Sequence, residues 1–543
     1  MLTKKNLLFL LYVIIVLAAV ICALIFAYEP VRLYVIFPLN ILLAVVGILV
    51  LLELYSGLIY VGRKNREEAR LKSMRSKTAE TLKDSLPSGL ELNAPNPNCI
   101  KIAMDKDCPS IACIIAAYLP NEEEIIEETV LHLLQNVYFP SSCKHKIILA
   151  YNTPKDMPEI EKRLRDIQSQ NSSRFICVRV MQSTSKAHNV NYVLENILIG
   201  DEEPDVCAIY DADHKPAEDA IGRALRHFQN DPELDVLQGR CVVTNGHESW
   251  MSYIVGAEFD FLYGICHTGR SLVYNFAIFG GTNGYWKCKV LREIEFKTDM
   301  LTEDVDASMR SVQLNKKTKY DHRIESRELA PVTFSSFMKQ RSRWAQGWFQ
   351  VTVKRFANVF KSVNGLRRKI GVFIILLFRD LSFHICFLLL LLQLILLTLP
   401  KSITEPNGKS FSESWKLALD IQGIIAFSMM GLLLFSIFVS LLVVRSEYTS
   451  VPQAAFYTFM FTFLNFLNMY LALQSQVAES LKEDKWIVTP RGRKNESSSE
   501  KAAIKIEIEN DQGLKSILTP ASVVSEKRPI PVAPPLPPPS YEY

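Results

Sequence analysis

The stretch Ile111-Ala112-Cys113-Ile114-Ile115-Ala116-Ala117 decides the fold of this chain. Its apolar residues show no alternation, which predicts a strand buried on both faces, as in parallel sheets. Further short apolar runs and helical stretches alternate after it. The runs are Lys146–Tyr151, Phe175–Met181 and Asp205–Asp211, and the helical stretches lie near Glu122–Gln135, Lys155–Ile167 and Lys186–Ile199. This order predicts a mostly parallel α/β sheet, which binds ligands at the carboxyl ends of its strands.

Apolar runs of membrane-spanning length flank this soluble-looking region on both sides. Two precede it, and the basic residues before the first and after the second place both flanks in the cytosol. Three apolar segments follow, at about 371–399, 417–444 and 451–473. We therefore expect a transmembrane hairpin over 1–62, a basic, polar cytosolic linker over 63–109 and a C-terminal transmembrane region over 366–475.

Composition excludes some classes of function. The net charge of +4 and the 22% of charged residues give no reason to expect nucleic acid as a partner. The 11 cysteines include no CxxC pair, so zinc sites and disulfides are not expected. Free thiols fit a reducing compartment.

A pair of carboxylates, Asp211 and Asp213, follows the run that ends at Tyr210. Two acids one residue apart at a strand end suit a hard divalent cation that also binds phosphate oxygens. The alternative is an ordinary acidic surface turn.

A second acidic group, Thr302-Glu303-Asp304, stands at an expected helix start. Thr302 can cap the helix and the acids suit its positive end, which is a purely structural interpretation. The functional interpretation is a general base that takes a proton from an acceptor hydroxyl.

The third group, Gln340-Arg341-Ser342-Arg343-Trp344, lies in an aromatic-rich segment over 334–365. This pattern predicts an amphipathic helix at the membrane surface. Arginine also suits a diphosphate leaving group, and a tryptophan face suits the apolar side of a sugar ring.

In this order, the three groups resemble the motifs of the processive family-two glycosyltransferases, which include cellulose, other β-glucan, mannan, chitin and hyaluronan synthases. Other segments agree with the resemblance: Ala117–Glu123 after the first strand, Lys186 with Asn191, and the Gly-rich stretch Phe279–Gly284. The resemblance covers about 110–350. It implies a GT-A domain over 110–333, a UDP-sugar donor, a polysaccharide acceptor, Mg2+ or Mn2+ as cofactor, and inversion at the anomeric carbon.

The resemblance also implies a role for each matching residue. Asp304 is the catalytic base, with Glu303 beside it, and Asp211 and Asp213 hold the metal. Donor and diphosphate binding fall to Asp211, Lys186, Asn152, Arg343 and Gln340. Acceptor binding falls to Trp344, Gly281, Thr282 and Asn283.

Two features fit the resemblance less well. Asn152 stands where the family usually places an aspartate against the uracil. Within an expected interface region over 476–494, the segment Trp486–Arg491 resembles the gating loop of cellulose synthases, in which Trp486, Val488, Thr489 and Arg491 match. Three C-terminal crossings would put this loop on the wrong side of the membrane, so either one segment does not cross or the loop has another role.

The favoured interpretation is a multi-pass enzyme of the plasma membrane or Golgi, with a cytosolic catalytic domain, that makes a β-glucan from UDP-glucose and translocates it. The alternatives are a glycolipid-forming transferase like ceramide glucosyltransferases, a hyaluronan- or chitin-type synthase, and a scaffold with a decayed catalytic domain. The tail over 495–543 is expected to be disordered. Its Pro538-Pro539-Ser540-Tyr541 and Pro534–Pro537 segments match ligands of WW and SH3 domains.

Overall fold

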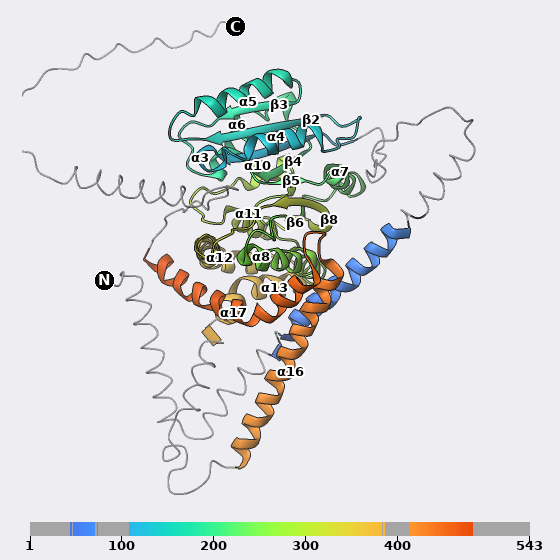
Figure 1. Ribbon diagram of the computed structural model, residues 1–543, viewed down its shortest axis with the longest axis vertical. Coiled ribbons are helices and arrows are strands. Elements are labelled where there is room, and N and C mark those ends of the chain that lie inside the picture. Colours follow the sequence, from blue (N-terminus) through green and yellow to red (C-terminus); the bar gives the residue numbers. More distant parts are fainter. Residues whose placement is uncertain are drawn as a thin grey trace, which may run out of the picture. The chain divides into compact units, whose positions relative to one another are not determined.

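A computed structural model shows a mixed α/β domain with long helices on one side of it (Figure 1). The structure describes residues 44, 45, 47–70, 73, 108–382, 384, 385 and 413–481, with side chains from 428 onward in the last range. The first apolar run, most of the basic linker, the gating-loop-like segment and the Pro-rich tail lie outside the described residues. The gating-loop and WW- or SH3-ligand assignments therefore stay predictions.

An eight-stranded sheet forms the centre of the domain, in the order β3-β2-β1-β4-β7-β6-β8-β5. The strands β3, β2, β1 and β4 run parallel, as expected, and β6 is parallel to β8. Strand β7 is antiparallel to both of its neighbours, and β5 is antiparallel to β8. The sheet is thus mixed, and the expectation of a mostly parallel sheet holds for its first half. Strand bounds are β1 Ile111–Tyr118, β2 His145–Asn152, β3 Phe175–Arg179, β4 Val206–Asp211, β5 Lys215–Pro216, β6 Val236–Val243, β7 Gly284–Lys287 and β8 Thr318–Glu328.

Helices cover both faces of this sheet. Alternate residues of β1 enter two different cores: Ile111, Cys113 and Ile115 pack with α4, α5 and α7, whereas Ala112 and Ile114 pack with α6, α10 and α11. An uninterrupted apolar strand is therefore what this position requires. The helices of this part are α3 Leu119–Glu122, α4 Ile126–Gln135, α5 Pro158–Gln170, α6 Lys186–Asn196, η1 Gly200–Glu202, α7 Ala220–Asn230, α10 Cys288–Ile294 and α11 Glu303–Gln313.

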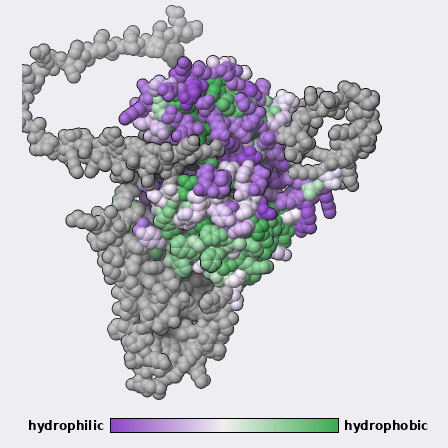
Figure 2. Space-filling model, in the orientation of Figure 1, coloured by the Kyte–Doolittle hydropathy of each residue, from purple (hydrophilic) through white to green (hydrophobic). Residues whose placement is uncertain are grey.

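A second layer of helices lies on the side of β6 and β8. It contains α8 Trp250–Phe261, η2 Leu262–Cys266, α9 His267–Tyr274, α12 Phe334–Ser362, α13 Leu366–Val372, η3 Phe373–Phe378, α16 Glu413–Val444 and α17 Val451–Ser480. The helix α12 contacts both α11 and α17, so it packs within the protein and does not lie alone at a surface. Figure 2 shows hydrophilic side chains gathered over the upper half of the sheet domain and hydrophobic ones over the half that carries this layer.

Among the described residues, α17 is the one helix that is long and apolar enough to cross a membrane, and Ser428–Val444 of α16 is a shorter apolar stretch. The multi-pass arrangement expected from the sequence therefore stays a proposal. The eight cysteines that the structure describes are free thiols, which agrees with the expectation from their spacing.

Candidate active site

The candidate site begins at the carboxyl end of β4, where Asp211 meets the first residue of α6. The Lys186 Nζ atom donates to Asp211 Oδ1 at 2.5 Å and to the carbonyl oxygen of Gly281 at 2.5 Å. Burial lowers the pKa of Lys186, but the charge of Asp211 outweighs burial and the net shift is upward. Lys186 therefore remains a fixed positive charge between a strand end and the Gly-rich stretch.

The Gly-rich stretch from Phe279 to Gly284 is held rigidly by buried polar side chains. Gln238 accepts from the amide of Gly280 at 3.0 Å and donates to the carbonyl of Thr282 at 3.0 Å. The Thr282 hydroxyl accepts from the amide of Asp211 at 3.2 Å, and the Asn283 amide group donates to the carbonyls of Arg240 and Ile324, both at 2.9 Å. Thr282 and Asn283 thus fix the backbone of the stretch.

Gly281 brings this stretch against the carboxylate of Asp304. Its φ is +91°, a conformation that side chains disfavour. A Cβ atom added there would lie 2.8 Å from Asp304 Oδ2. Only glycine allows the loop to approach Asp304 this closely.

Glu303 and Asp304 form a half-buried acidic pair at the first turn of α11. Burial and the neighbouring charge of Asp304 raise the pKa of Glu303 to about 7. Burial also raises the pKa of Asp304, while the Val305 amide, Lys186 and Arg343 oppose that rise. Two coupled acids with raised pKa values are what a proton acceptor near neutral pH needs.

The helix α12 carries the Gln-x-x-Arg-Trp residues. Arg343 acts electrostatically on both Glu303 and Asp304, which places its charge at the acidic pair. The side-chain oxygen of Gln340 is buried and accepts no hydrogen bond from any residue that the structure describes. A buried acceptor of this kind can receive a hydroxyl group of a ligand.

Trp344 is half-buried and one face of its ring is covered. The Arg341 guanidinium lies 4.6 Å from the Trp344 ring centroid, and Glu258 holds that guanidinium with two hydrogen bonds of 3.0 and 2.6 Å. The indole is therefore held from one side by a fixed guanidinium. Arg341 and Glu258 were not singled out from the sequence, because their pairing spans 83 positions.

Asp211, Asp213 and His214 form a group that can hold a cation, with ligand atoms within 4.8 Å of one another. Lys186 contacts one oxygen of Asp211, so a bound metal would share this carboxylate with the lysine. Burial lowers the pKa of His214, but Glu328 outweighs it and the net shift is upward. The donor set of two carboxylates fits a hard divalent cation, which supports the metal-ligand roles expected for Asp211 and Asp213.

Two asparagines named from the sequence make hydrogen bonds within the protein, and their expected roles toward the nucleotide stay predictions. Asn152 is buried and both its polar atoms are engaged, its amide group donating to the Ser183 carbonyl and its oxygen accepting from Asn189, both at 3.0 Å. Asn191 makes two hydrogen bonds to the backbone of Phe296, at 2.8 and 3.0 Å, so it braces that loop.

Thr302 stands at the N-cap position of α11, but its side chain makes no capping hydrogen bond. Its buried hydroxyl packs instead against Gly347 of α12, where an added Cβ would lie 2.6 Å from the oxygen. The capping role expected from the sequence is therefore wrong, and Thr302 serves the contact between α11 and α12.

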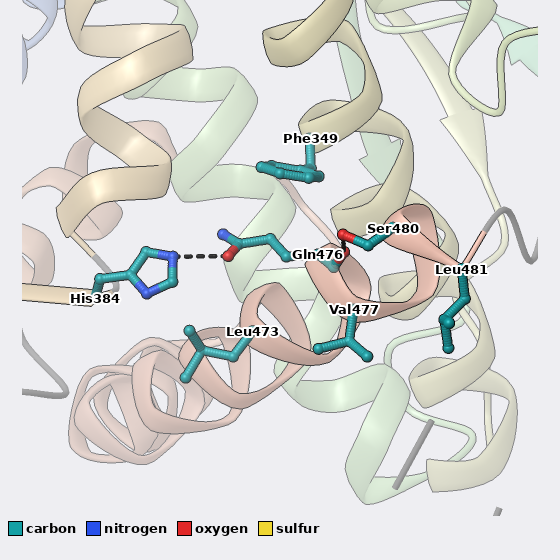
Figure 3. Close-up of a pocket in the computed structure, with 7 residues that line it drawn as sticks. All are labelled: Phe349, His384, Leu473, Gln476, Val477, Ser480 and Leu481. Atoms are coloured by element: carbon teal, nitrogen blue, oxygen red, sulfur yellow. Dashed lines mark hydrogen bonds between the residues drawn. The ribbon is translucent and has the colours of Figure 1, made fainter. Parts of the chain in front are cut away.

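A cavity of about 360 Å³ lies between α12 and the last turns of α17 (Figure 3). Phe349 covers one side of it, and His384 bonds to the side-chain oxygen of Gln476 at 2.7 Å. No carboxylate of the acidic group lines this cavity, so it is separate from the candidate catalytic centre. It begins on α12 five positions beyond Trp344, or about 7.5 Å along the helix axis.

Residues 207–473 match the family described as Glycosyl transferase family group 2. The chain is 23% identical over 336 residues to the probable glycosyltransferase YdaM of Bacillus subtilis, a match that covers 56% of this chain and 78% of that protein. It is 25% identical over 253 residues to the poly-β-1,6-N-acetyl-D-glucosamine synthase of Staphylococcus aureus, covering 46% of this chain and 58% of that relative.

A solved structure, the mannosyltransferase PcManGT from Pyrobaculum calidifontis in complex with GDP-Man and Mn2+, aligns with a TM-score of 0.45 and 15% identity. The alignment covers 82% of this chain and 98% of that one.

Proposed function

We propose that this glycosyltransferase, whose residues 207–473 match family group 2, transfers sugar from a UDP-sugar to a growing β-linked polysaccharide. One observation carries the proposal. The Gly-rich stretch, the Lys186–Asp211 pair and the carboxylate of Asp304 converge at Gly281. A cationic donor site and a proton acceptor therefore lie side by side.

In the proposed reaction, Asp304 accepts the proton of an acceptor hydroxyl as its oxygen attacks the anomeric carbon. The bond from that carbon to the donor diphosphate breaks, and the sugar is inverted. Arg343 and Lys186 supply positive charge near the leaving group, because a guanidinium matches phosphate oxygens. A divalent cation held by Asp211 and Asp213 would neutralise further diphosphate charge when bound.

The acceptor is proposed to rest against the ring of Trp344. The fixed indole offers an apolar platform to a sugar ring, and the unsatisfied oxygen of Gln340 offers it a hydrogen-bond acceptor. The match to a poly-β-1,6-N-acetyl-D-glucosamine synthase supports a polymer over a glycolipid product.

UDP-glucose is the donor that the motifs favour, and UDP-N-acetylglucosamine is the second candidate. The second rests on the Staphylococcus aureus relatives, whose name specifies a poly-N-acetylglucosamine product. A screen of UDP-sugars on purified membranes, with linkage-specific digestion of the product, separates the two. Labelled lipid in place of a digestible polymer would favour the glycolipid alternative.

The base is tested by Asp304→Asn. This change keeps the size of the side chain but removes the proton acceptor, so transfer should fall at least ~100-fold, the usual contribution of a general base. UDP binding should be largely retained. The matched control is Asp299→Asn, since Asp299 lies just before α11, is 70% exposed and pairs with Lys354. Near-normal turnover in Asp304→Asn would contradict the proposed role.

A further inference from the structure

The long apolar helix α17 is attached to the catalytic domain at both of its ends. Near its N-terminus, the Gln453 amide group donates to the carbonyl of Tyr253 on α8 at 2.6 Å. Near its C-terminus, Glu479 accepts from Gln346 on α12 at 3.3 Å. Both α8 and α12 pack against the sheet domain, through β6 and α11.

This double attachment is incompatible with a membrane crossing. Gln453 and Glu479 are 26 positions apart, which corresponds to about 39 Å of helix. The hydrocarbon core of a bilayer is only about 30 Å thick. A crossing helix of this length would carry one end to the far side of the membrane, where no part of the catalytic domain could bind it.

The two faces of α17 differ in the way expected of a helix between protein and lipid. Its inner face is buried and includes small and polar residues, namely Gln453, Ala454, Ala472, Ser475 and Ala478. Its outer face carries exposed aromatic residues three or four positions apart, namely Phe456, Phe459, Phe463, Phe466 and Tyr470, of which Phe459 is 79% exposed. Aromatic side chains at this spacing form one stripe along a helix.

The neighbouring helix α16 is attached to the catalytic domain at its C-terminal end. Its last carbonyl, that of Val444, accepts from Arg240 of β6 at 2.7 Å, and the following Ser446 bonds to Asp260 at 2.8 Å. Its outer side chains, including Leu432 and Phe435, are exposed. Figure 1 shows α16 leading away from the sheet domain while α17 runs beneath it.

Lipid is the partner that these surfaces fit. Exposed apolar side chains also lie on α16 and on the helix over 47–70, where Ile48, Leu52 and Tyr55 are exposed. Arg367, Arg368 and Lys369 precede the first C-terminal apolar segment, where positive charge marks the cytosolic boundary of a membrane.

We infer that α17 lies along the membrane surface, with its inner face on the catalytic domain and its aromatic stripe in lipid, and that it does not cross the bilayer. Of the three C-terminal crossings expected from the sequence, two then remain, and Val444, at the end of the second, bonds to Arg240 of the catalytic domain. Leu481, which follows α17, lies on that same side of the membrane.

The depth of α17 is tested by quenching with brominated lipids. Single variants Phe456→Trp, Phe463→Trp and Tyr470→Trp are reconstituted as the full chain, and the fluorescence of the parent protein is subtracted. These positions span about 21 Å of helix. An in-plane helix predicts equal quenching at all three, strongest for bromines near the headgroups. Matched controls are Leu432→Trp and Leu442→Trp on α16, about 15 Å apart along its axis, which should differ in depth.

A steady change of depth from position 456 to position 470 would show a crossing helix and overturn the inference. No quenching at any of the three, together with cross-linking between chains, would show that a second copy covers the stripe and would also overturn it. Topology gives an independent readout in sealed vesicles. A C-terminal tag and a tag in the linker over 63–109 should be cleaved by protease from the same side, and protection of one alone contradicts the inference.

Discussion

At the acidic pair, the protonation of each carboxylate depends on its neighbour. Glu303 has a pKa of about 7 because it is buried and lies beside Asp304, and Lys186 and Arg343 limit the effect. Like charges this close titrate as a pair, and neutralising one favours ionisation of the other. The pair therefore takes up a proton as the pH falls through neutrality.

The pH profile should show this coupling. In the proposed reaction transfer needs an unprotonated Asp304, so kcat/KM should rise with pH. The midpoint of this acidic limb should lie above the ordinary pKa of a carboxyl group. Glu303→Gln leaves Asp304 as the one titrating acid of the pair, so the acidic limb should then fit a single ionisation, whereas the parent fits two. The measurement is log kcat/KM against pH, with Asp299→Asn as control. A limb of unchanged shape would assign it to another group.

Gly281 allows a test of the contact with Asp304, because Gly365 has a similar positive φ but different surroundings. Both Gly281 and Gly365 have positive φ, +91° and +86°, but an added Cβ meets Asp304 at Gly281 and nothing within 4 Å at Gly365. Gly281→Ala should therefore lower transfer about 100-fold, the cost of misplacing a reacting group by about 1 Å.

The control Gly365→Ala should carry backbone strain of about 1–2 kcal/mol and retain its kinetics. The comparison is made with initial rates and thermal midpoints of both variants. Equal losses of activity in the two would show that backbone strain, not contact with Asp304, explains the effect.

Short motifs were enough to select Asp211 and Asp304, which the structure brings together around Gly281, while their roles in the reaction stay proposals. The limits are equally specific. Asn152 follows a strand end like a ligand contact, but its amide is engaged by Ser183 and Asn189. The support of Trp344 by Glu258 depends on residues far apart in sequence, and no local pattern indicates it.

Between elements, the contact of α11 with α12 sets the distance from the base to the Gln-x-x-Arg-Trp residues. Gly347 of α12 lies directly against Thr302, and Asp306, fully buried, binds Arg310 at 2.7 Å and Arg355 of α12 at 2.6 Å. An ion pair with two arginines compensates a buried carboxylate that would otherwise be costly. The two helices are thereby held together on both sides of the turn that carries Glu303 and Asp304.

Gly347→Ala should separate these helices, because its Cβ would lie 2.4 Å from Cγ2 of Thr302. We expect a stability loss of about 1–3 kcal/mol and a fall in transfer of on the order of tenfold or more. Adding Thr302→Ala removes two of the three close atoms and should restore part of the activity. Rates of the two single variants and the double variant form the cycle. The control is Gly431→Ala on α16, where an added Cβ meets nothing within 4 Å. Additive losses of activity for Gly347→Ala and Thr302→Ala would contradict the proposed contact.

The pattern of strands was more predictable than their directions. Uninterrupted apolar runs correctly indicated β1 to β4, since both faces of each are covered. The antiparallel insertion of β7 between β4 and β6 depends on the Gly-rich stretch returning toward the sheet, and hydrophobic periodicity carries no such information. For the same reason, composition alone makes α17 look like a membrane span, whereas its hydrogen bonds to α8 and α12 decide its place.

For the molecule as a whole, the helical layer between sheet and apolar surface determines how membrane and catalysis are connected. The Glu53 carboxylate, in the helix over 47–70, is buried and bonds to Arg270 at 3.0 Å and to Tyr274 at 2.5 Å. The Arg240 side chain binds Asp260 and the end of α16. Apolar helices from both ends of the chain thus meet the catalytic domain through buried charges, which define one geometry for each contact.

Arg240 has a consequence for how the enzyme responds to its surroundings. Its guanidinium holds the last carbonyl of α16, while its own carbonyl accepts from Asn283, two positions from Gly281. A thicker or thinner bilayer tilts a helix of fixed apolar length. A tilt of α16 would therefore be transmitted through Arg240 to the Gly-rich stretch. We expect turnover in reconstituted bilayers to pass through an optimum as acyl-chain length varies, with donor affinity nearly constant, so that the lipid acts as a mechanical regulator of chain growth.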